Sequence, residues 1–489
     1  MCGIKFDDSD DLKMEFGYMR KWDMMRLAVE IVNGAFKFFD IKREIKKIGR
    51  IPWDLKGMIT IIFFAGIEGI ISSNKISEKA KTDRIYRLLS GKTTPDGRTI
   101  RDYNGIYKEI YKMILSFTLI IAQNLGLSSF KHLSVDGTIK LACNSPFNIM
   151  KVKDIRLLIK HYMVQELTKK EIESLRKSSK KFFYNNKLSS EEKINILFEW
   201  YDKLELTGQT SISLHDPDAR LMKIKDKGQK YKKFAYNVQV ITDTTSKMIC
   251  GVLVVQSPTD HYQLPEIVEQ GIENLQMKPA IISADCIYGT LANLFYLKQK
   301  GISVRIPTSK QSNEAIGKKS ENKYAIEYFV FDENKNVFVC PEKEELTQDG
   351  VYDAPMEKGG FNKKKIIYSN YKACKNCPCK SKCTKSQHRT ITRYVHELSF
   401  EAEKIMNTEE GQIDYKQRSR TVEAHNGTFI HVYNYDRLQV VGLEKTQEVM
   451  FKIAAAYNTI RIFNITQKIG LDLSNVINKI STIALNTHV

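Results

Sequence analysis

Two aspartates directly follow short apolar runs in this sequence. His132-Leu-Ser-Val leads to Asp136, and Pro279-Ala-Ile-Ile-Ser-Ala leads to Asp285. Each run predicts a short buried strand that ends at its aspartate, and Asp136-Gly137 is typical of a turn. Two carboxylates at the ends of neighbouring strands would form half of a site for a hard divalent cation. A single aspartate in this position more often starts a turn or caps a helix, so it is the pair that indicates a site.

A third carboxylate, Glu423, lies in a strongly basic segment that begins at Tyr415. If this segment is helical, Tyr415, Arg418 and Glu423, or their immediate neighbours, lie near one face. Cations beside a metal-binding carboxylate suit phosphodiester chemistry. They orient the strand, while two metal ions about 4 Å apart activate the attacking oxygen and stabilise the leaving one. Taken alone, Glu423 would more often form a surface salt bridge with Arg420 or Lys416.

The segments that must position these acids predict a mixed α/β sheet covered by helices. The expected order is strand, hairpin, helix, strand, helix, strand, over residues 133–135, 234–255, 262–275, 279–285, 291–300 and 302–306. From residue 307 to about 393 the pattern breaks into short strands, loops and a cysteine cluster, which indicates an insertion. Helical periodicity resumes over 400–406, 413–421 and 443–465.

The region before the first acid is helical, with apolar residues at helical spacing between about residues 14 and 123. Basic residues, including Arg98 and Arg101, lie among short helices and polar turns there, which suits a small DNA-binding module. A solvated bundle without a ligand explains the pattern equally well. Residues 155–201 also predict helices, and they are heavily charged.

Four parts are therefore expected along the chain. Residues 1–127 form a helical N-terminal DNA-binding domain, and 128–306 form the first part of the catalytic core, with a helical insertion at about 150–205. The cysteine cluster lies in an insertion over 307–398. Residues 399–489 complete the core with the third acid and the closing helices.

Composition points to a polyanionic partner. The 489 residues carry 76 Lys and Arg against 57 Asp and Glu, a net charge of +19 that is spread along the chain. Such an excess favours nucleic acid over an anionic membrane surface, although a generally basic protein is the simpler alternative. The most apolar run, 58–71, is too short to span a bilayer and contains Glu68, so it predicts a buried helix. No secretory signal is visible, and we expect a cytoplasmic protein without membrane association.

The cysteines indicate a local metal site in a reducing compartment, because their number, nine, is odd and several are clustered. The preferred ligand set for a structural Zn²⁺ is Cys340, Cys374, Cys377 and Cys383. Cys379 could replace Cys340, and His388 is a weaker substitute. An iron–sulfur cluster on the same four thiolates and free thiols without metal are the alternatives.

Several motifs follow one another in a characteristic order. They are Arg98-Thr-Ile, Val135-Asp-Gly-Thr, His215-Asp-Pro-Asp-Ala-Arg, Asp285-Cys-Ile-Tyr-Gly, Arg418-Ser-Arg-Thr-Val-Glu and Ala456-Tyr-Asn. The ordered set resembles bacterial insertion-sequence transposases with a DDE-type, RNase H-like catalytic domain. Within them, the chain is similar to the subgroup with a helical N-terminal domain and a cysteine cluster before the last acid. The expected fold class is therefore α/β, an RNase H-like mixed sheet flanked by helices.

The resemblance implies that Asp136, Asp285 and Glu423 hold two Mg²⁺ ions. Water and then a 3′-hydroxyl would attack the phosphodiester, giving DNA cleavage and strand transfer. The partners would be double-stranded DNA, both the terminal inverted repeats of the element and the target, and a second protomer in a homodimer on DNA. In a bacterium the active protein would be nucleoid-associated. The expected DNA-binding residues are Tyr415, Arg418, Arg420, Arg98 and Arg101.

The chain departs from this family after the third acid. A Lys or Arg usually follows the glycine there, but this sequence has Phe429, Ile430 and His431. Glu448 on the next helix is the rival for the third acid. Two other functions remain open: a catalytically inactive, transposase-derived DNA-binding protein, and a structure-specific RNase H-like nuclease that cuts DNA or an RNA–DNA hybrid.

Overall fold

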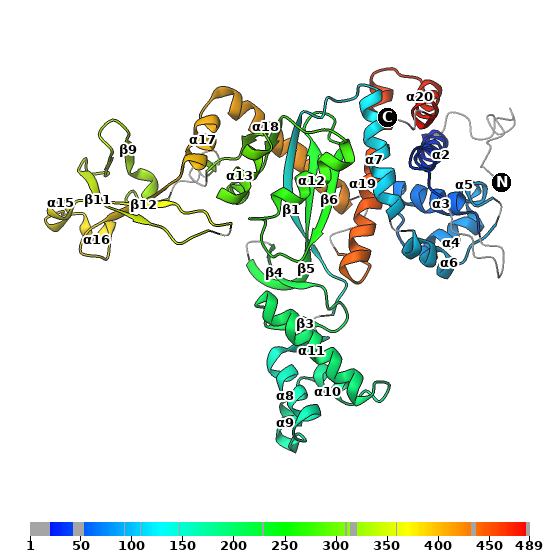
Figure 1. Ribbon diagram of the computed structural model, residues 1–489, viewed down its shortest axis with the longest axis horizontal. Helices are drawn as coiled ribbons and strands as arrows, with labels where there is room; N and C mark the ends of the chain where they lie inside the picture. Colours follow the sequence, from blue (N-terminus) through cyan, green and yellow to red (C-terminus); the bar gives the residue numbers. More distant parts are fainter. Residues whose placement is uncertain are drawn as a thin grey trace.

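The computed structural model describes residues 20–42, 53–91, 93–107, 109–145, 147–226, 229–308, 311–312, 320–357, 359–431 and 437–485. Within these ranges, it describes the backbone alone at 225–226, 229–230, 422–426 and 428–431. Figure 1 shows a central sheet with the N-terminal helices on one side of it. The insertion that carries the cysteines extends from the other side, and a helical arm projects beyond the end of the sheet at β4.

The central sheet has six strands, and its order explains how the two aspartates meet. The main path is β6 (Ile249–Val255), β5 (Gln229–Asp243), β1 (His132–Leu141), β7 (Ile281–Ser283) and β8 (Ser303–Arg305). The first three strands are antiparallel, whereas β7 and β8 run parallel to β1. β4 (Arg220–Asp226) pairs with the first half of β5. This is the mixed sheet expected of an RNase H-like fold, and the predicted fold class is confirmed.

The sequence predicted that the first strand ends at Asp136, and this prediction is wrong. β1 continues to Leu141, because its second half pairs with β5 from Gly137↔Gln239 to Leu141↔Ala235. Gly137 does not form a turn, but it allows neighbouring side chains to approach the backbone of β1 closely. A Cβ there would lie 2.5 Å from Asp260 Oδ1 and 2.6 Å from Gln239 Nε2, so glycine makes room for these side chains.

The helices that flank the sheet lie where the periodicity placed them. They are α7 (Glu109–Asn124), α12 (Leu264–Leu275), α13 (Leu291–Gln299), α17 (Glu397–Met406), α18 (Glu409–His431) and α19 (Leu443–Lys468). α7, α12 and α19 pack on β6, whereas α18 packs across β1, β5, β7 and β8. A last helix, α20 (Leu473–Leu485), packs on α2 (Arg20–Phe38) and was not anticipated from the sequence.

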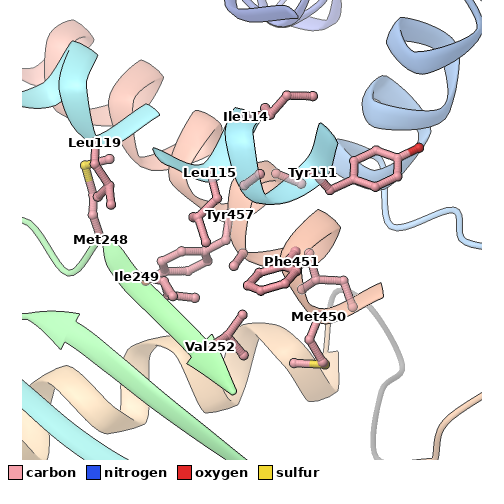
Figure 2. Close-up of a cluster of buried hydrophobic side chains, with 14 of the residues drawn as sticks. Tyr111, Ile114, Leu115, Leu119, Met248, Ile249, Val252, Met450, Phe451 and Tyr457 are labelled. Atoms are coloured by element: carbon pink, nitrogen blue, oxygen red, sulfur yellow. The ribbon is translucent and has the colours of Figure 1, made fainter. Parts of the chain in front are cut away.

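The N-terminal helices share one hydrophobic core with the sheet. Besides α2 and α7 they are α3 (Leu55–Ile67), α4 (Ser73–Thr82), α5 (Arg84–Leu89) and α6 (Gly97–Ile106). Figure 2 shows side chains of α7 and α19, among them Tyr111, Leu115 and Tyr457, packed together over Ile249 and Val252 of β6 and over Met248, which precedes that strand. Removing this apolar surface from water stabilises the contact by about 25 cal/mol per Å².

The first ten residues of the apolar run 58–71 lie in α3, which is buried along almost its whole length and ends at Ile67. Glu68, the carboxylate at its end, accepts a hydrogen bond from Tyr86 and pairs with Lys21 at 2.9 Å. Within the described ranges, no helix combines the length and the hydropathy that a bilayer crossing requires.

Two further units have small cores of their own. The helical arm consists of β2 (Ile149–Lys151), α8 (Val152–Met163), α9 (Lys169–Ser174), α10 (Lys177–Phe183), α11 (Ser190–Thr207) and β3 (Ser211–Ser213). The cysteine insertion forms a five-stranded sheet of β9 (Val330–Asp332), β10 (Val337–Val339), β11 (Glu345–Asp353), β12 (Lys364–Ser369) and β13 (Thr390–Val395). Its cysteines lie mainly on and around α15 (Tyr371–Lys375) and α16 (Lys380–Cys383). The four domain boundaries given above remain predictions.

Candidate active site

The parallel pairing of β1 and β7 brings Asp136 and Asp285 together. The two strands pair from His132↔Ile281 to Ser134↔Ser283, and each aspartate lies two residues beyond this last pair. A single guanidinium nitrogen, Nη2 of Arg418, lies 2.6 Å from Asp136 Oδ1 and 4.0 Å from Asp285 Oδ2.

Asp285 also caps the short turn that follows it. Its Oδ1 accepts a hydrogen bond of 2.8 Å from the backbone N–H of Ile287, while Oδ2 faces Arg418. The capping role that the sequence left open is therefore real. It occupies one oxygen and leaves the other available to the site.

Burial raises the pKa of Asp136 to about 6. Arg418 opposes this shift, whereas the nearby charges of Asp285 and Asp260 add to it. A buried carboxylate among other carboxylates is electrostatically unfavourable unless a cation compensates it. Here the guanidinium of Arg418 supplies that positive charge.

Three side chains along one face of α18 fix the helix against the sheet. Asp414 accepts a hydrogen bond of 2.9 Å from Arg305 Nε on β8, and Arg418 binds Asp136 on β1. Thr421 accepts a bond of 2.9 Å from Lys247 Nζ, in the turn between β5 and β6. These positions are spaced by four and three residues, as one helix face requires.

Of the other predicted residues of this helix, Tyr415 lies near the acids and Arg420 does not contact them. The Tyr415 ring lies 6.0 Å from the Arg418 guanidinium. Burial raises the pKa of Tyr415, and the nearby negative charge of Asp285 adds to the shift. Arg420 is exposed.

The two candidates for the third acid lie on different helices. Glu423 belongs to α18, five residues beyond Arg418, but its side chain lies outside the described part of the structure. Phe429, Ile430 and His431 lie on the same helix, and their side chains are likewise outside it. Glu448 is buried on α19, where its charge acts on Lys452 and on Tyr111 of α7.

A further carboxylate, Asp260, belongs to this neighbourhood and was missed by the sequence reasoning. It follows β6, and its Oδ1 accepts hydrogen bonds of 2.6 Å from both Asn237 Nδ2 and Gln239 Nε2. The hydroxyl of Tyr288 donates to Gln239 Oε1, so a chain of hydrogen bonds fixes the carboxylate behind Gly137. The available signal was a third apolar strand followed by an aspartate, since the run 248–255 leads to Gln256-Ser-Pro-Thr-Asp260.

We predict that Asp260→Asn lowers the rate of DNA cleavage by about 10- to 100-fold, the usual effect of losing a group that supports metal ligands. The asparagine carbonyl can still accept bonds from Asn237 and Gln239, so the fold should persist. Cleavage measured against Mg²⁺ concentration should shift to higher Mg²⁺. Glu266→Gln, an exposed acid on α12, is the matched control. Equal Mg²⁺ dependence of both variants and wild type would exclude this role.

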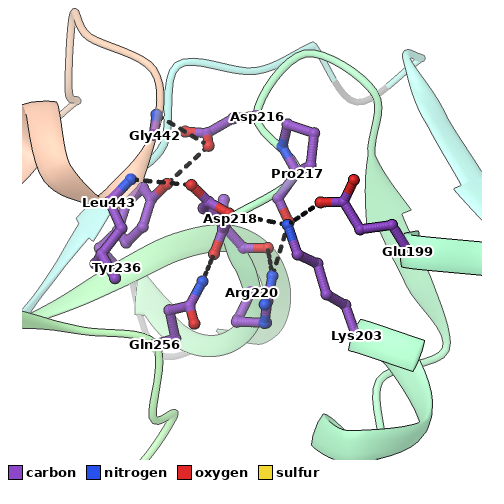
Figure 3. Close-up of polar contacts among 11 residues, drawn as sticks. Glu199, Lys203, Asp216, Pro217, Asp218, Arg220, Tyr236, Gln256, Gly442 and Leu443 are labelled. Atoms are coloured by element: carbon purple, nitrogen blue, oxygen red, sulfur yellow. Dashed lines mark hydrogen bonds and ion pairs between the residues drawn. The ribbon is translucent and has the colours of Figure 1, made fainter. Parts of the chain in front are cut away.

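The motif His215-Asp-Pro-Asp-Ala-Arg forms a structural joint (Figure 3). Asp216 is fully buried, and its Oδ1 accepts bonds of 2.7 Å from the Tyr236 hydroxyl and 3.2 Å from the Gly442 N–H. Asp218 accepts from the Leu443 N–H at 3.3 Å and from Lys203 Nζ at 3.4 Å. The motif therefore ties the beginning of α19 to β5 and to the helical arm.

The predicted DNA-binding residues lie on two separate surfaces. Arg98 and Arg101 are exposed on α6, and Arg101 donates to Asn74 Oδ1 at 3.3 Å. α18, with Arg418 and Arg420, lies on the opposite side of the sheet (Figure 1).

The four cysteines of the preferred ligand set converge on one small cavity of about 40 Å³: Cys340, Cys374, Cys377 and Cys383. Burial raises the pKa of the Cys383 thiol, and its three thiol neighbours add to the shift. Cys379 is not part of this cavity and lies beside Tyr324 and Glu342. His388 packs against the ring of Tyr371.

Both clusters have the donor chemistry that a metal needs, carboxylates for Mg²⁺ and thiols for Zn²⁺. Among the described side chains, no three His, Cys, Asp or Glu residues are gathered closely enough to hold an ion as they stand. Near β1 and β7, the positive charge beside the two acids is the Arg418 guanidinium.

Comparison with known families gives a match to one part of the chain. Residues 339–463 match the family model described as "Transposase DDE domain". The match confirms the predicted resemblance to DDE transposases, over about a quarter of the chain. It includes the cysteine cluster, Arg418 and Glu423, whereas Asp136 and Asp285 precede it.

No curated protein matches the chain. Among solved structures, it is similar to the piggyBac transposase in a synaptic complex with hairpin DNA, with a TM-score of 0.32 and 8% identity. That alignment covers 97% of this chain and 81% of the other. The assignment of the fold depends on the strand order described above and not on this likeness.

Proposed function

We propose that this chain is a DNA transposase that cleaves and joins DNA strands at the terminal inverted repeats of an insertion sequence. The observation that carries the proposal is the pair Asp136 and Asp285 at adjoining positions of β1 and β7, both in contact with Arg418. The family match over the segment that contains α18 supports it.

Asp136, Asp285 and Glu423 are proposed to hold two Mg²⁺ ions, with Asp260 behind the first acid. Bound Mg²⁺ supplies activation of the attacking oxygen and stabilisation of the leaving one. The protein itself positions the carboxylates, through the parallel register of β1 and β7 and the hydrogen bonds to Asp260.

Tyr415, Arg418 and Arg420 are proposed to orient the scissile strand through its phosphates, because they share the helix that packs over the acids. Arg98 and Arg101 are proposed to bind the terminal repeat from α6. Two DNA ends must be brought together, so we propose a homodimer on DNA that acts at the bacterial nucleoid. A Zn²⁺ ion on Cys340, Cys374, Cys377 and Cys383 is proposed to stabilise the insertion.

The test is cleavage and strand transfer on a DNA fragment that carries the element's own end, with Mg²⁺. Glu423→Gln is expected to lower cleavage by at least about 100-fold, as loss of a group acting on the reacting atoms does. Glu448→Gln, on the neighbouring helix, should retain cleavage. Salt-sensitive binding should persist in both variants.

Each alternative function predicts a different result. Binding of the end without cleavage by wild type would identify an inactive relative. Cleavage that does not depend on the end sequence would identify a nuclease. Loss at Glu448→Gln but not at Glu423→Gln would place the third acid on α19.

A further inference from the structure

A second cavity, of about 360 Å³, lies between the N-terminal helices and the beginning of α19. Its walls come from the start of α4, from α6, from residues 439–441 and from the first turns of α19. The joint at Asp216 and Asp218 holds the 442–443 backbone and thereby fixes the wall next to it. Its volume falls in the range of small-molecule sites, about 300 to 1,000 Å³.

Lys452 is the unusual residue of this cavity. Its side chain is only 2% exposed, and its aliphatic part packs against Gly66 of α3. The ammonium makes no hydrogen bond or ion pair with any described residue. It lies 5.7 Å from the centre of the Tyr111 ring, and the charge of Glu448 acts on it. The ammonium faces the cavity, where an anionic ligand would add to the compensation that the Glu448 charge provides.

Most of the charged groups that line the cavity are basic. Arg101 and Lys445 are exposed at its edge, while Lys452 lies at its floor. Together with Glu448 these groups carry a net positive charge. The first turn of α4 also lines the cavity, and its N-cap residue, Ser72, makes no capping hydrogen bond. The free N–H groups of a helix start favour an anion.

We propose that this cavity binds a phosphate-bearing ligand of about one nucleotide in size. The cations and the start of α4 bind the phosphate, and the apolar wall formed by Ile71, Val440 and Val449 lies against the base. Two sources share this chemistry: one nucleotide of a bound DNA strand, or a free nucleotide. The first source rests on the proposed transposase function, whereas the second does not.

The experiment uses the full chain and three variants. Deoxyadenosine monophosphate and inorganic phosphate are titrated calorimetrically into wild type, Lys452→Met, Arg101→Gln and Lys81→Gln. Lys81 is an exposed cation on α4 outside the cavity and serves as the control of equal charge. We expect at least a tenfold loss of nucleotide affinity in Lys452→Met and Arg101→Gln, and none in Lys81→Gln. Without ligand, Lys452→Met should melt at a higher temperature than wild type, because it removes the buried charge while keeping the packing against Gly66.

Binding of an end-carrying DNA fragment to the same variants distinguishes the sources. Weaker DNA binding by Lys452→Met and Arg101→Gln, but not by Lys81→Gln, supports a nucleotide of the DNA strand. Unchanged DNA binding with weakened nucleotide binding supports a free nucleotide. If neither probe binds, or if all variants bind equally, the cavity site is wrong even where DNA cleavage is normal. Because Arg101 is at the surface, the nucleotide affinity of its variant tests the site even if Lys452→Met fails to fold. Its DNA affinity does not, since Arg101 is also proposed to bind the terminal repeat.

Discussion

Asp136→Asn and Asp285→Asn are each expected to lower DNA cleavage by about 100- to 1,000-fold while leaving DNA binding intact. Asparagine keeps the shape of the side chain but removes the negative charge that a divalent cation needs. At Asp136 the change also removes the anionic partner of Arg418, whose bond to Oδ1 is 2.6 Å long. Rates on a pre-cut and an uncut end substrate would show whether hydrolysis and strand transfer are lost together.

The control for both substitutions is Asp202→Asn, an exposed acid on α11 in the helical arm. It should cleave like wild type. DNA affinity, measured at two salt concentrations, should be the same for all four proteins, because the charge change is small against the net +19 of the chain. Normal cleavage by either Asp136→Asn or Asp285→Asn would show that the chemistry resides elsewhere in the molecule.

The second large effect is expected in the cysteine insertion. Wild type should contain one tightly bound Zn²⁺, and the double variant Cys374→Ser, Cys377→Ser should contain none. Structural zinc sites contribute folding free energy directly, on the order of 10 kcal/mol in small domains. The small core around Phe329, Leu346 and Tyr368 should then lose most of its stability. Metal content by mass spectrometry and hydrogen exchange of β11 and β12 are the measurements.

Cys379→Ser is the matched control, because Cys379 lies outside the cavity that the other four line. It should keep its zinc and its protection from exchange. Loss of metal in this variant would move the ligand set toward Cys379, and visible absorbance in wild type would identify an iron–sulfur cluster instead. A metal-free wild type with a protected insertion would show that the thiols are only part of its core.

Local spacing was enough to predict most elements. The alternating and apolar runs over 234–255 predicted the hairpin of β5 and β6, and the apolar runs before Asp136 and Asp285 predicted β1 and β7. The same spacing misplaced the end of β1. A glycine after an aspartate is a turn signal locally, but this strand continues because β5 pairs with it as far as Leu141.

Only the tertiary structure could join residues that are distant in the sequence. The contact between Arg418 and Asp136 spans 282 positions, and it depends on how α18 lies across the sheet. Asp260 lies near Asp136 because β5 pairs with both β1 and β6. No local sequence pattern encodes this pairing.

The sequence by itself determined the types of residue that do chemistry, the helices and strands that carry them, and the resemblance to DDE transposases. The tertiary structure decided which carboxylates adjoin, which four cysteines share a cavity, and that Lys452 faces a cavity without a hydrogen-bonding partner among the described residues. The reason is physical. Helix and strand periodicity is a property of neighbouring residues, whereas pairing register and burial depend on the whole set of packed segments.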